Sequence, residues 1–418
     1  MTMPSQYDLI VIGGGAAGFF GAIEAAQSKK GYRVLILEKT SKLLSKVKVS
    51  GGGRCNVTHH CFEATPLSKH YPRGQRALKS LFQKFQAKDT VAWFQNHGVE
   101  LKAEEDGRMF PVTNNSQTII DCFLREAERL NIEIKISQEV THIEKTKKLF
   151  HVHCNEQQYT ATHILVACGG YNKPENYLWL SDLGHEIIQP IPSLFTFNDS
   201  SKEFTELMGV AVPDAEVKIA GSKLSQRGPM LITHWGLSGP AVIKLSAWAA
   251  IDLHKVHYTF TALVNWTGKP ETELRNTLMK LKNENSKKHV LSNPLFNLPK
   301  RLWEFLCLKA GAEEGRTWSD QSYKVINRLI ELLFACPFQI EGKTTFKEEF
   351  VTCGGVSLND IELNSMESKK VSCLYFAGEI LDIDGETGGF NFQAAWTTAW
   401  VAAASITKDK ELQPSYSK

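Results

Sequence analysis

The beginning of the chain contains the pattern that most restricts how it can fold. Residues 7–13, YDLIVIG, form a short apolar run, as expected of a strand that is buried on both faces. This run leads into the G-x-G-x-x-G of residues 13–18, then into a small-residue segment with helical character, and then into a second apolar run, residues 32–38, that ends in Glu38. A strand, a glycine turn, a helix, a second strand and an acid, in this order, predict a dinucleotide-binding Rossmann fold.

Each part of this pattern has a physical role. We expect Gly13 to permit the tight turn, Gly15 to let the backbone approach a pyrophosphate, and Gly18 to let the helix pack closely on the strand. The unpaired amides and the positive dipole end at the helix start attract phosphate, and the Glu38 carboxylate would accept hydrogen bonds from a ribose diol. The predicted cofactor-binding residues of this segment are Gly13, Gly15, Ala16, Ala17, Gly18, Glu38 and Lys39.

The rest of the chain favours FAD over NAD. Residues 161–170, ATHILVACGG, form a buried strand that would return the chain to the nucleotide fold after a β-meander. The meander strands are predicted at 132–136, 142–145 and 149–154, and the backbone near Val140 would pair with the adenine edge. An NAD dehydrogenase does not need another nucleotide-domain strand near the end of the chain, yet residues 374–379, LYFAGE, form one.

A glycine loop and an apolar helix that starts near Asn391 follow this last strand. We expect Glu379 or Asp382 to lie near the ribitol hydroxyls of a flavin, and the helix start to face the pyrimidine end of the isoalloxazine, where its dipole favours negative charge. The predicted FAD-binding residues of these later segments are Val140, Ala167, Cys168, Gly169, Gly378, Glu379, Asp382, Gly389, Phe390, Asn391 and Phe392.

A second glycine run lies at residues 50–56, SGGGRCN. Three consecutive glycines allow backbone amides to approach a planar or anionic group closely. The side chains of Arg54 and Asn56 add hydrogen-bond donors. We therefore add Gly52, Gly53, Arg54, Cys55 and Asn56 to the predicted cofactor site.

Taken together, these segments resemble a known family. The chain contains, in order, SGGGRCNVTH at 50–59, DGRMFP at 106–111, THWGLSGPAV at 233–242, VTCGGVSL at 351–358 and FAGEILDIDGETGGFNFQ at 376–393. These motifs resemble those of the BaiN/RdsA-like NAD(P)/FAD-dependent oxidoreductases, a family also labelled aminoacetone-oxidase-like. The resemblance implies an FAD-binding domain in discontinuous pieces, of the two-dinucleotide-binding type, with an inserted substrate region that is part β-barrel-like and part helical.

The pattern of the insertion agrees with this architecture. Residues 190–266 are rich in β-type segments and turns, whereas residues 267–340 include stretches with helical periodicity. We expect an α/β chain divided into a first FAD-binding part at 1–190, a β-rich insert at 191–266, a helical insert at 267–344 and a C-terminal FAD-binding part at 345–418.

The resemblance also implies an activity, namely flavin hydride transfer. The activities that the resemblance implies include the reduction of activated carbon–carbon double bonds and, for some members, amine oxidation. One branch of the family reduces a uridine of large-subunit ribosomal RNA to dihydrouridine. We expect the reduction of a ribosomal RNA uridine. The alternatives are a small-molecule oxidoreductase such as an amine oxidase, and a non-catalytic protein that binds FAD and RNA. No second G-x-G-x-x-G is present, so NAD(P)H would have to reach the flavin transiently as an electron donor.

Charge is distributed unevenly along the chain. Residues 39–88 contain eleven Lys or Arg and one acid, a net charge of +10, so the remaining residues carry −7 of the total of +3. Such a basic region attracts polyanions such as ribosomal RNA, although a solvated protein face has the same composition. Tyr71, Phe82 and Phe85 lie among these cations, where they would either stack on bases or form the core face of a helix.

Reduction of a uracil double bond also needs a proton donor. Cys55, Cys353 and His234 are candidates, but a buried structural role fits each of them as well. His151 and His153 would share a strand face without a third ligand, so no metal site is expected.

The cysteines and the hydropathy point to a compartment. The nine cysteines include no C-x-x-C pair, which indicates reduced thiols in a cytoplasm. No apolar run is long enough for a membrane helix, and the N-terminus has no basic segment typical of a signal peptide. We therefore expect a cytoplasmic protein.

Overall fold

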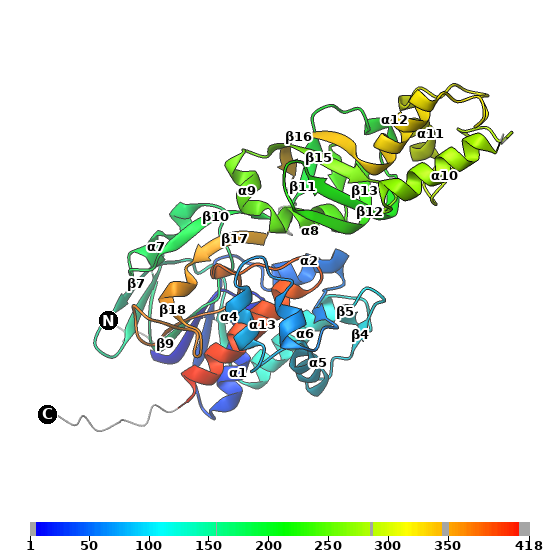
Figure 1. Cartoon of the computed structure of the whole chain (residues 1–418). Helices are drawn as coiled ribbons and strands as arrows, with labels where there is room; N and C mark the ends of the chain where they lie inside the picture. Colours follow the sequence, from blue (N-terminus) through cyan, green and yellow to red (C-terminus); the bar gives the residue numbers. More distant parts are fainter. Residues whose placement is uncertain (1–5, 156, 285–286, 345–350, 409–418) are drawn as a thin grey trace. The chain divides into compact units, whose positions relative to one another are not determined.

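The computed structural model describes residues 6–155, 157–284, 287–344 and 351–408. The chain forms two compact units (Figure 1). The first, here called the nucleotide unit, consists of Met1–Pro192 and Lys347–Lys418, and the second, the barrel unit, is Ser193–Phe346. The barrel unit is thus an insertion between two parts of the nucleotide unit.

A parallel sheet forms the centre of the nucleotide unit. Its strands lie in the order β20 (Leu374–Phe376), β9 (Gln157–Val166), β1 (Gln6–Ile12), β2 (Val34–Leu37) and β6 (Glu133–Lys135). All four residues of β2 and nearly all of β1 are buried, which is why both strands are continuously apolar in sequence. The predicted Rossmann-type fold is confirmed, including the return of the chain to this sheet in β9 and β20.

The β-meander differs from the prediction in its first strand. It consists of β7 (Val140–Lys145), β8 (Phe150–Cys154) and the first part of β9, joined by antiparallel pairing. Residues 132–136 were expected to open the meander, but β6 instead pairs with β2 in parallel. It follows helix α6 (Gln117–Arg129), which provides the crossover that a parallel neighbour requires. A short apolar run does not reveal which strand it will pair with, and this explains the error.

Two helices with small apolar residues pack on each other against the sheet: α1 (Ala16–Ser28) and α13 (Phe390–Ile406). Phe20 of α1 and Trp396 of α13 meet in the core, with ring centroids 5.5 Å apart. No helix in the described ranges has both the length and the apolar character needed to cross a membrane. The remaining elements of this unit are α2 (Ser45–Gly53), β3 (Thr58–His59), α3 (Ala64–Ser68), α4 (Gln75–Leu81), α5 (Ala87–Asn96), β4 (Leu101–Ala103), β5 (Arg108–Pro111), α7 (Leu178–Ser181), β10 (Ile187–Ser193), β17 (Val351–Val356), β18 (Ile361–Glu362) and β19 (Glu367–Ser368).

The barrel unit contains a closed six-stranded barrel. Its strands are β11 (Thr196–Asp199), β14 (Gly236–Ser238), β13 (Ser225–Thr233), β12 (Ala211–Ile219), β15 (Thr259–Asn265) and β16 (Cys336–Thr344). The helices are α8 (Pro240–Trp248), α9 (Ala250–Lys255), α10 (Glu271–Asn283), α11 (Lys300–Lys309) and α12 (Tyr323–Phe334). One hydrophobic core includes residues of the strands and of α10, α11 and α12.

The range 267–344 was predicted to be helical, but its last part is a strand. In β16 the buried residues Cys336, Phe338 and Ile340 alternate with exposed ones, which is the period of a half-buried strand. This strand pairs with β11 and β15 and so closes the barrel.

Candidate functional site

The first glycine turn is shaped by close packing at two of its glycines. A Cβ at Gly13, where φ is +112°, would lie 2.5 Å from the carbonyl oxygen of Ala167, and one at Gly18 would lie 1.9 Å from that of Gly13. Gly15, by contrast, has no atom within 4 Å of its Cβ position. Gly13 and Gly18 therefore let the turn pass against the end of β9, whereas Gly15 leaves open space before the first amides of α1. The segment Ala167–Gly169 is brought beside the turn as predicted.

Glu38 lies at the edge of this turn. Its Oε2 accepts a hydrogen bond from the Gly14 backbone N–H at 2.8 Å, and its Oε1 accepts one from that of Thr40 at 2.8 Å. The Thr40 hydroxyl also donates to Oε1 at 2.8 Å, so the carboxylate is held beside the turn and its Oε2 retains a lone pair for a ribose. Lys39 lies 4.9 Å from the centroid of the Tyr171 ring. The Gln138 N–H donates to the Glu38 carbonyl at 2.9 Å, which places the start of β7 at Val140 close to this edge.

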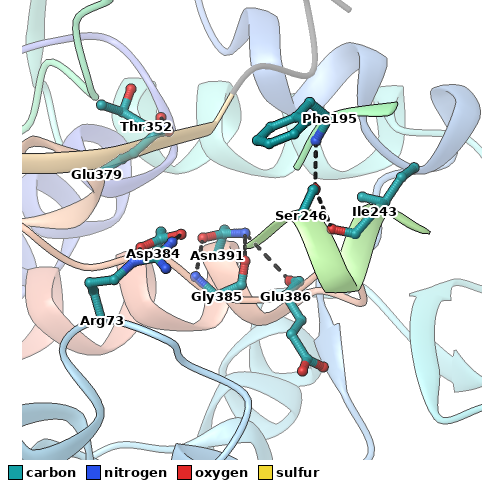
Figure 2. Close-up of polar contacts among 10 residues, drawn as sticks. All are labelled: Arg73, Phe195, Ile243, Ser246, Thr352, Glu379, Asp384, Gly385, Glu386 and Asn391. Atoms are coloured by element: carbon teal, nitrogen blue, oxygen red, sulfur yellow. Dashed lines mark hydrogen bonds and ion pairs between the residues drawn. The ribbon is translucent and has the colours of Figure 1, made fainter. Parts of the chain in front are cut away.

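The end of β20 meets the start of α1. A Cβ at Gly378 would lie 2.9 Å from the Cβ of Ala17, and the Gly378 N–H donates to Thr398 Oγ1 at 2.9 Å. Glu379 follows, with one carboxylate oxygen 2.7 Å from Lys46 Nζ and the other accepting from the Thr352 N–H at 2.9 Å (Figure 2). Segments from both ends of the chain therefore converge here.

Two buried polar atoms at this place have no hydrogen-bond partner among the described residues: Asp382 Oδ1 and Thr352 Oγ1. Burial raises the pKa of the Asp382 carboxyl, although the positive charge of Arg73 opposes the shift. Buried polar atoms without partners are costly and rare. A ribityl chain, which carries several hydroxyls, would satisfy both of them, so the residues fit FAD. Thr352 is the neighbour of Cys353 in the VTCGG motif and was not among the predicted site residues.

The second glycine run adopts a left-handed backbone. The φ angles of Gly51, Gly52 and Gly53 are +59°, +70° and +82°, and helix α2 is kinked at Ser50. No atom lies within 4 Å of the Cβ positions of Gly52 and Gly53. These glycines thus provide a turn that only glycine adopts easily, next to open space.

The side chains that follow this run bind to the protein itself. Arg54 pairs with Glu104 at 2.5 Å and lies 4.0 Å from the centroid of the Phe110 ring. In the amide orientation that satisfies its neighbours, Asn56 accepts from the Gly389 N–H at 2.9 Å and donates to the Thr58 carbonyl at 3.0 Å. Both side chains were predicted as donors to the cofactor, and in this structure they position the loop, with Asn56 joining it to the start of α13.

The start of α13 is held by a network of side chains. Arg73 forms a buried bidentate ion pair with Asp384, and the Asn391 side chain both accepts from Gly385 N–H at 2.9 Å and donates to its carbonyl at 3.0 Å (Figure 2). The Tyr71 hydroxyl donates to the Phe390 carbonyl at 2.7 Å. The loop 384–389 is therefore fixed before the helix begins. Of the other predicted residues, Phe392 stacks on Trp396.

The predicted proton donors are poorly placed for that role. Cys55 and Cys353 are buried in the protein interior, and burial raises the pKa of each thiol to about 12. His234 is exposed in the hairpin between β13 and β14 of the barrel unit, against Trp235.

Sequence reasoning did not select two histidines near the start of α13. The rings of His59 and His70 both stack on Phe390, with centroid distances of 4.7 and 4.2 Å. His70 Nδ1 lies 3.1 Å from the carboxylate of Glu386, which is buried, whereas His70 is partly exposed. A histidine held by a buried carboxylate can store and transfer a proton.

The basic region separates into paired and unpaired cations. Lys46, Arg54 and Arg73 form ion pairs with Glu379, Glu104 and Asp384, and the other eight Lys and Arg of residues 39–88 form none within the described part of the chain. All eight are exposed. Tyr71, Phe82 and Phe85 are buried in the core, so they are not free to stack on bases. They do not form the core face of a helix, because Tyr71 precedes α4 and the two phenylalanines follow it.

Comparison with known proteins identifies the family. A family model described as HI0933-like protein Rossmann domain matches residues 7–405. The chain belongs to the HI0933-like family. This HI0933-like protein is 30% identical to a Haemophilus influenzae protein named ribosomal RNA dihydrouridine synthase, over 97% of this chain and 100% of that one. It is 25% identical to a Clostridium scindens protein named 3-dehydro-bile acid delta(4,6)-reductase, over 95% of this chain and 98% of that one.

The fold of the HI0933-like protein also matches solved enzymes. One match is the crystal structure of a 3-ketosteroid delta1-dehydrogenase from Sterolibacterium denitrificans. The superposition includes 96% of this chain and 99% of that enzyme, with a TM-score of 0.52 and 11% sequence identity. Family membership and fold together establish an FAD-dependent oxidoreductase with a Rossmann-type FAD-binding domain.

Proposed function

We propose that this protein reduces the C5–C6 double bond of a uridine in large-subunit ribosomal RNA and so forms dihydrouridine. The observation that carries the proposal is the 30% identity, along essentially the full length of both chains, to a protein named ribosomal RNA dihydrouridine synthase. The eight exposed, unpaired cations of residues 39–88 support it, because an RNA substrate is held mainly through its phosphates.

FAD, when bound, supplies the hydride for such a reduction. We propose that it is held by the turn at Gly13–Gly18, by Glu38, by the Thr352–Asp382 pair and by the open backbone at Gly52 and Gly53. The protein would place the nucleotide phosphates at the first amides of α1 and the flavin end against the start of α13.

The proton would come from His70. Its contact with buried Glu386 orients the imidazole ring, and its partial exposure gives it access to a proton source. The expected result for His70→Gln is a fall in the rate of uridine reduction and the loss of one limb of its pH profile, with FAD content unchanged. A variant with the pH profile of the wild type contradicts this role.

The substrate is tested by mass spectrometry of ribosomal RNA from cells that lack the gene. One uridine should lose its two-dalton increment, and the wild-type gene should restore it. In vitro, the reduced protein mixed with unmodified ribosomal RNA without oxygen should reoxidise its flavin and yield dihydrouridine. RNA that is unchanged in both experiments overturns the proposal.

A small-molecule double-bond reductase is the second candidate, favoured by the 25% identity to a bile acid reductase. Such an enzyme should turn over a conjugated enone and leave ribosomal RNA unmodified. An amine oxidase would instead produce peroxide from amines, and a purely FAD- and RNA-binding protein would bind RNA without changing it.

NAD(P)H is proposed as the electron donor. It is expected to bleach the 450 nm absorption of the protein without oxygen. Absorption that persists with both NADH and NADPH would exclude nicotinamide donors.

A further inference from the structure

A groove outside the predicted FAD site lies between helix α4 and the β18–β19 hairpin. Its volume is about 660 Å³, which lies within the range of small-ligand sites. One wall is the first part of α4 with the preceding Gly74, and the other is the segment 358–364 together with Lys369. We call it the α4 groove and consider it independently of the barrel unit, since all its walls belong to the nucleotide unit.

The walls of the groove combine amide side chains, cationic side chains and an apolar part. The amide side chains are those of Gln75, Asn359 and Asn364, all of them exposed. The apolar part is provided by Leu358, Ile361 and Leu363, of which Ile361 is fully buried. Amide groups offer a donor and an acceptor side by side and therefore match the edges of nucleobases.

The groove is also positively charged. Arg76 lies in its wall and has no ion pair in the part of the chain that the structure describes, and the exposed Lys79 follows one turn later on α4. Lys369 lies in the opposite wall, where its Nζ donates to the Asn359 carbonyl at 2.9 Å. These cations would attract the phosphates that flank a bound base.

Lys84 fixes the orientation of one amide. Its Nζ donates to the Asn364 carbonyl at 2.9 Å and to Asn364 Oδ1 at 3.2 Å. The Oδ1 is thus engaged, and the amide N–H groups of Asn364 are left to serve as donors. Glu362, whose carboxylate accepts from the Asn364 backbone N–H at 3.3 Å, provides an acceptor in the same wall. A carboxylate here disfavours a free anion but suits a base that carries N–H donors.

The groove wall at Gly74 packs on the segment that leads to α13. A Cβ at Gly74 would lie 2.7 Å from Ile383 Cγ1, and the preceding residue, Arg73, pairs with Asp384.

We propose that the α4 groove binds an unpaired nucleotide of the RNA substrate, separate from the uridine that is reduced. This inference rests on the proposed function, because it takes ribosomal RNA as the substrate. Sequence-specific RNA recognition generally uses single-stranded nucleotides whose base edges are free, and the groove provides amides for the base and cations for its phosphates.

The test uses the full-length FAD-loaded protein and a single-stranded oligoribonucleotide that contains 4-thiouridine and the sequence around the modified uridine. Ultraviolet crosslinking followed by peptide mass spectrometry should place crosslinks in residues 74–80 and 358–369. Asn364→Ala should weaken binding about tenfold at all salt concentrations, as expected for a lost base contact. Arg76→Ala should reduce the slope of log Kd against log salt by about 1, as expected for a lost phosphate contact.

Lys30→Ala, which removes an exposed cation elsewhere on the nucleotide unit, is the matched control and should leave both the affinity and the crosslinks unchanged. If the wild type forms dihydrouridine but the groove variants bind like Lys30→Ala and the crosslinks lie elsewhere, the groove assignment is overturned while the proposed function stands. If the wild type neither binds nor modifies the RNA, the proposed function fails and the groove assignment falls with it.

Discussion

The two glycine-rich openings of the nucleotide unit are held in different ways. At the start of α1, the backbone of one segment packs against the backbone of the next, and the close approaches at Gly13 and Gly18 leave no room for a side chain. At the start of α13, polar side chains hold the loop. Arg73 and Asn56 come from distant segments, and Asn391 belongs to α13 itself. The first opening depends on backbone packing alone. The second depends on charge and hydrogen bonding in addition to one close backbone approach, since a Cβ at Gly389 would lie 2.5 Å from the Thr58 carbonyl oxygen.

The largest effect is expected from the buried ion pair that supports the second opening. Asp384→Asn leaves the Arg73 guanidinium buried without its countercharge, which should lower the free energy of unfolding by about 3–5 kcal/mol. Urea denaturation of the FAD-free protein measures this. The bidentate pair of Arg227 with Asp214 in the barrel unit is the control, because both of its side chains are more than half exposed.

Arg227→Gln should change the free energy of unfolding much less than Asp384→Asn does, because exposed ion pairs contribute little to stability. Equal losses for the two variants would show that the buried pair contributes no more than a surface pair, and the contrast between the openings would then fail.

The next largest effect concerns the first opening. Gly18→Ala places a Cβ 1.9 Å from the Gly13 carbonyl oxygen, so β1 and α1 must move apart. We expect a loss of about 1–3 kcal/mol in the free energy of unfolding and a protein that is purified without FAD. Thermal unfolding and the ratio of absorption at 450 nm to that at 280 nm measure the two effects.

Gly15→Ala is the matched substitution in the same turn. Its Cβ would enter open space and its φ of −97° suits alanine, so the FAD-free protein should keep its stability. The methyl group would occupy the space proposed for the pyrophosphate, so FAD affinity should fall. If Gly15→Ala is as unstable as Gly18→Ala, the steric account of this opening is wrong.

The same difference explains what the sequence could reveal. The first opening is encoded locally, because the spacing of Gly13, Gly15 and Gly18 within one short segment itself indicates the turn. The second is encoded by pairs such as Arg73 and Asp384, which are 311 residues apart, and no local pattern joins them. The motifs therefore located the loop at Gly389 but gave no indication that Asn56 holds it or that His70 lies against Phe390.

Strand pairing and the burial of single polar atoms could not be predicted from the sequence either, because they also depend on distant segments. The pattern of residues 132–136 suited a strand in either arrangement, and only the crossover through α6 made it a parallel neighbour of β2. Cys353 and Thr352 lie next to each other in a fully buried strand. Cys353 was the predicted site residue because a thiol is the more reactive group. Only the three-dimensional structure reveals that the Thr352 hydroxyl has no hydrogen-bond partner among the described residues.

Asp382 provides a prediction in which binding and stability change in opposite directions. Folding raises the pKa of this carboxyl, so the ionised form costs free energy in the folded FAD-free protein. This cost is absent below the unfolded pKa of about 3.9, grows as the pH rises from there to the folded pKa, and is constant above it. Asp382→Asn should therefore make the FAD-free protein at least as stable as the wild type at neutral pH, with no advantage at acidic pH.

FAD affinity should nevertheless fall about tenfold in Asp382→Asn, because an acceptor for the ribityl hydroxyls is lost. Melting temperatures of the FAD-free proteins across pH, together with FAD titration, test both parts. Asp121→Asn, on the exposed face of α6, should change neither quantity. An unchanged FAD affinity in Asp382→Asn would remove this residue from the cofactor site.

The smallest effect is expected at Gly52, in the glycine run of residues 50–56. A Cβ here meets no atom within 4 Å, but φ is +70°, so Gly52→Ala should cost about 1 kcal/mol through backbone strain alone. Gly52→Asn should recover part of this loss, because asparagine tolerates the left-handed conformation better than alanine. If the open space beside Gly52 is used by FAD, both variants should also bind FAD more weakly than the wild type in a fluorescence titration. If both variants bind FAD normally, Gly52 serves only the turn.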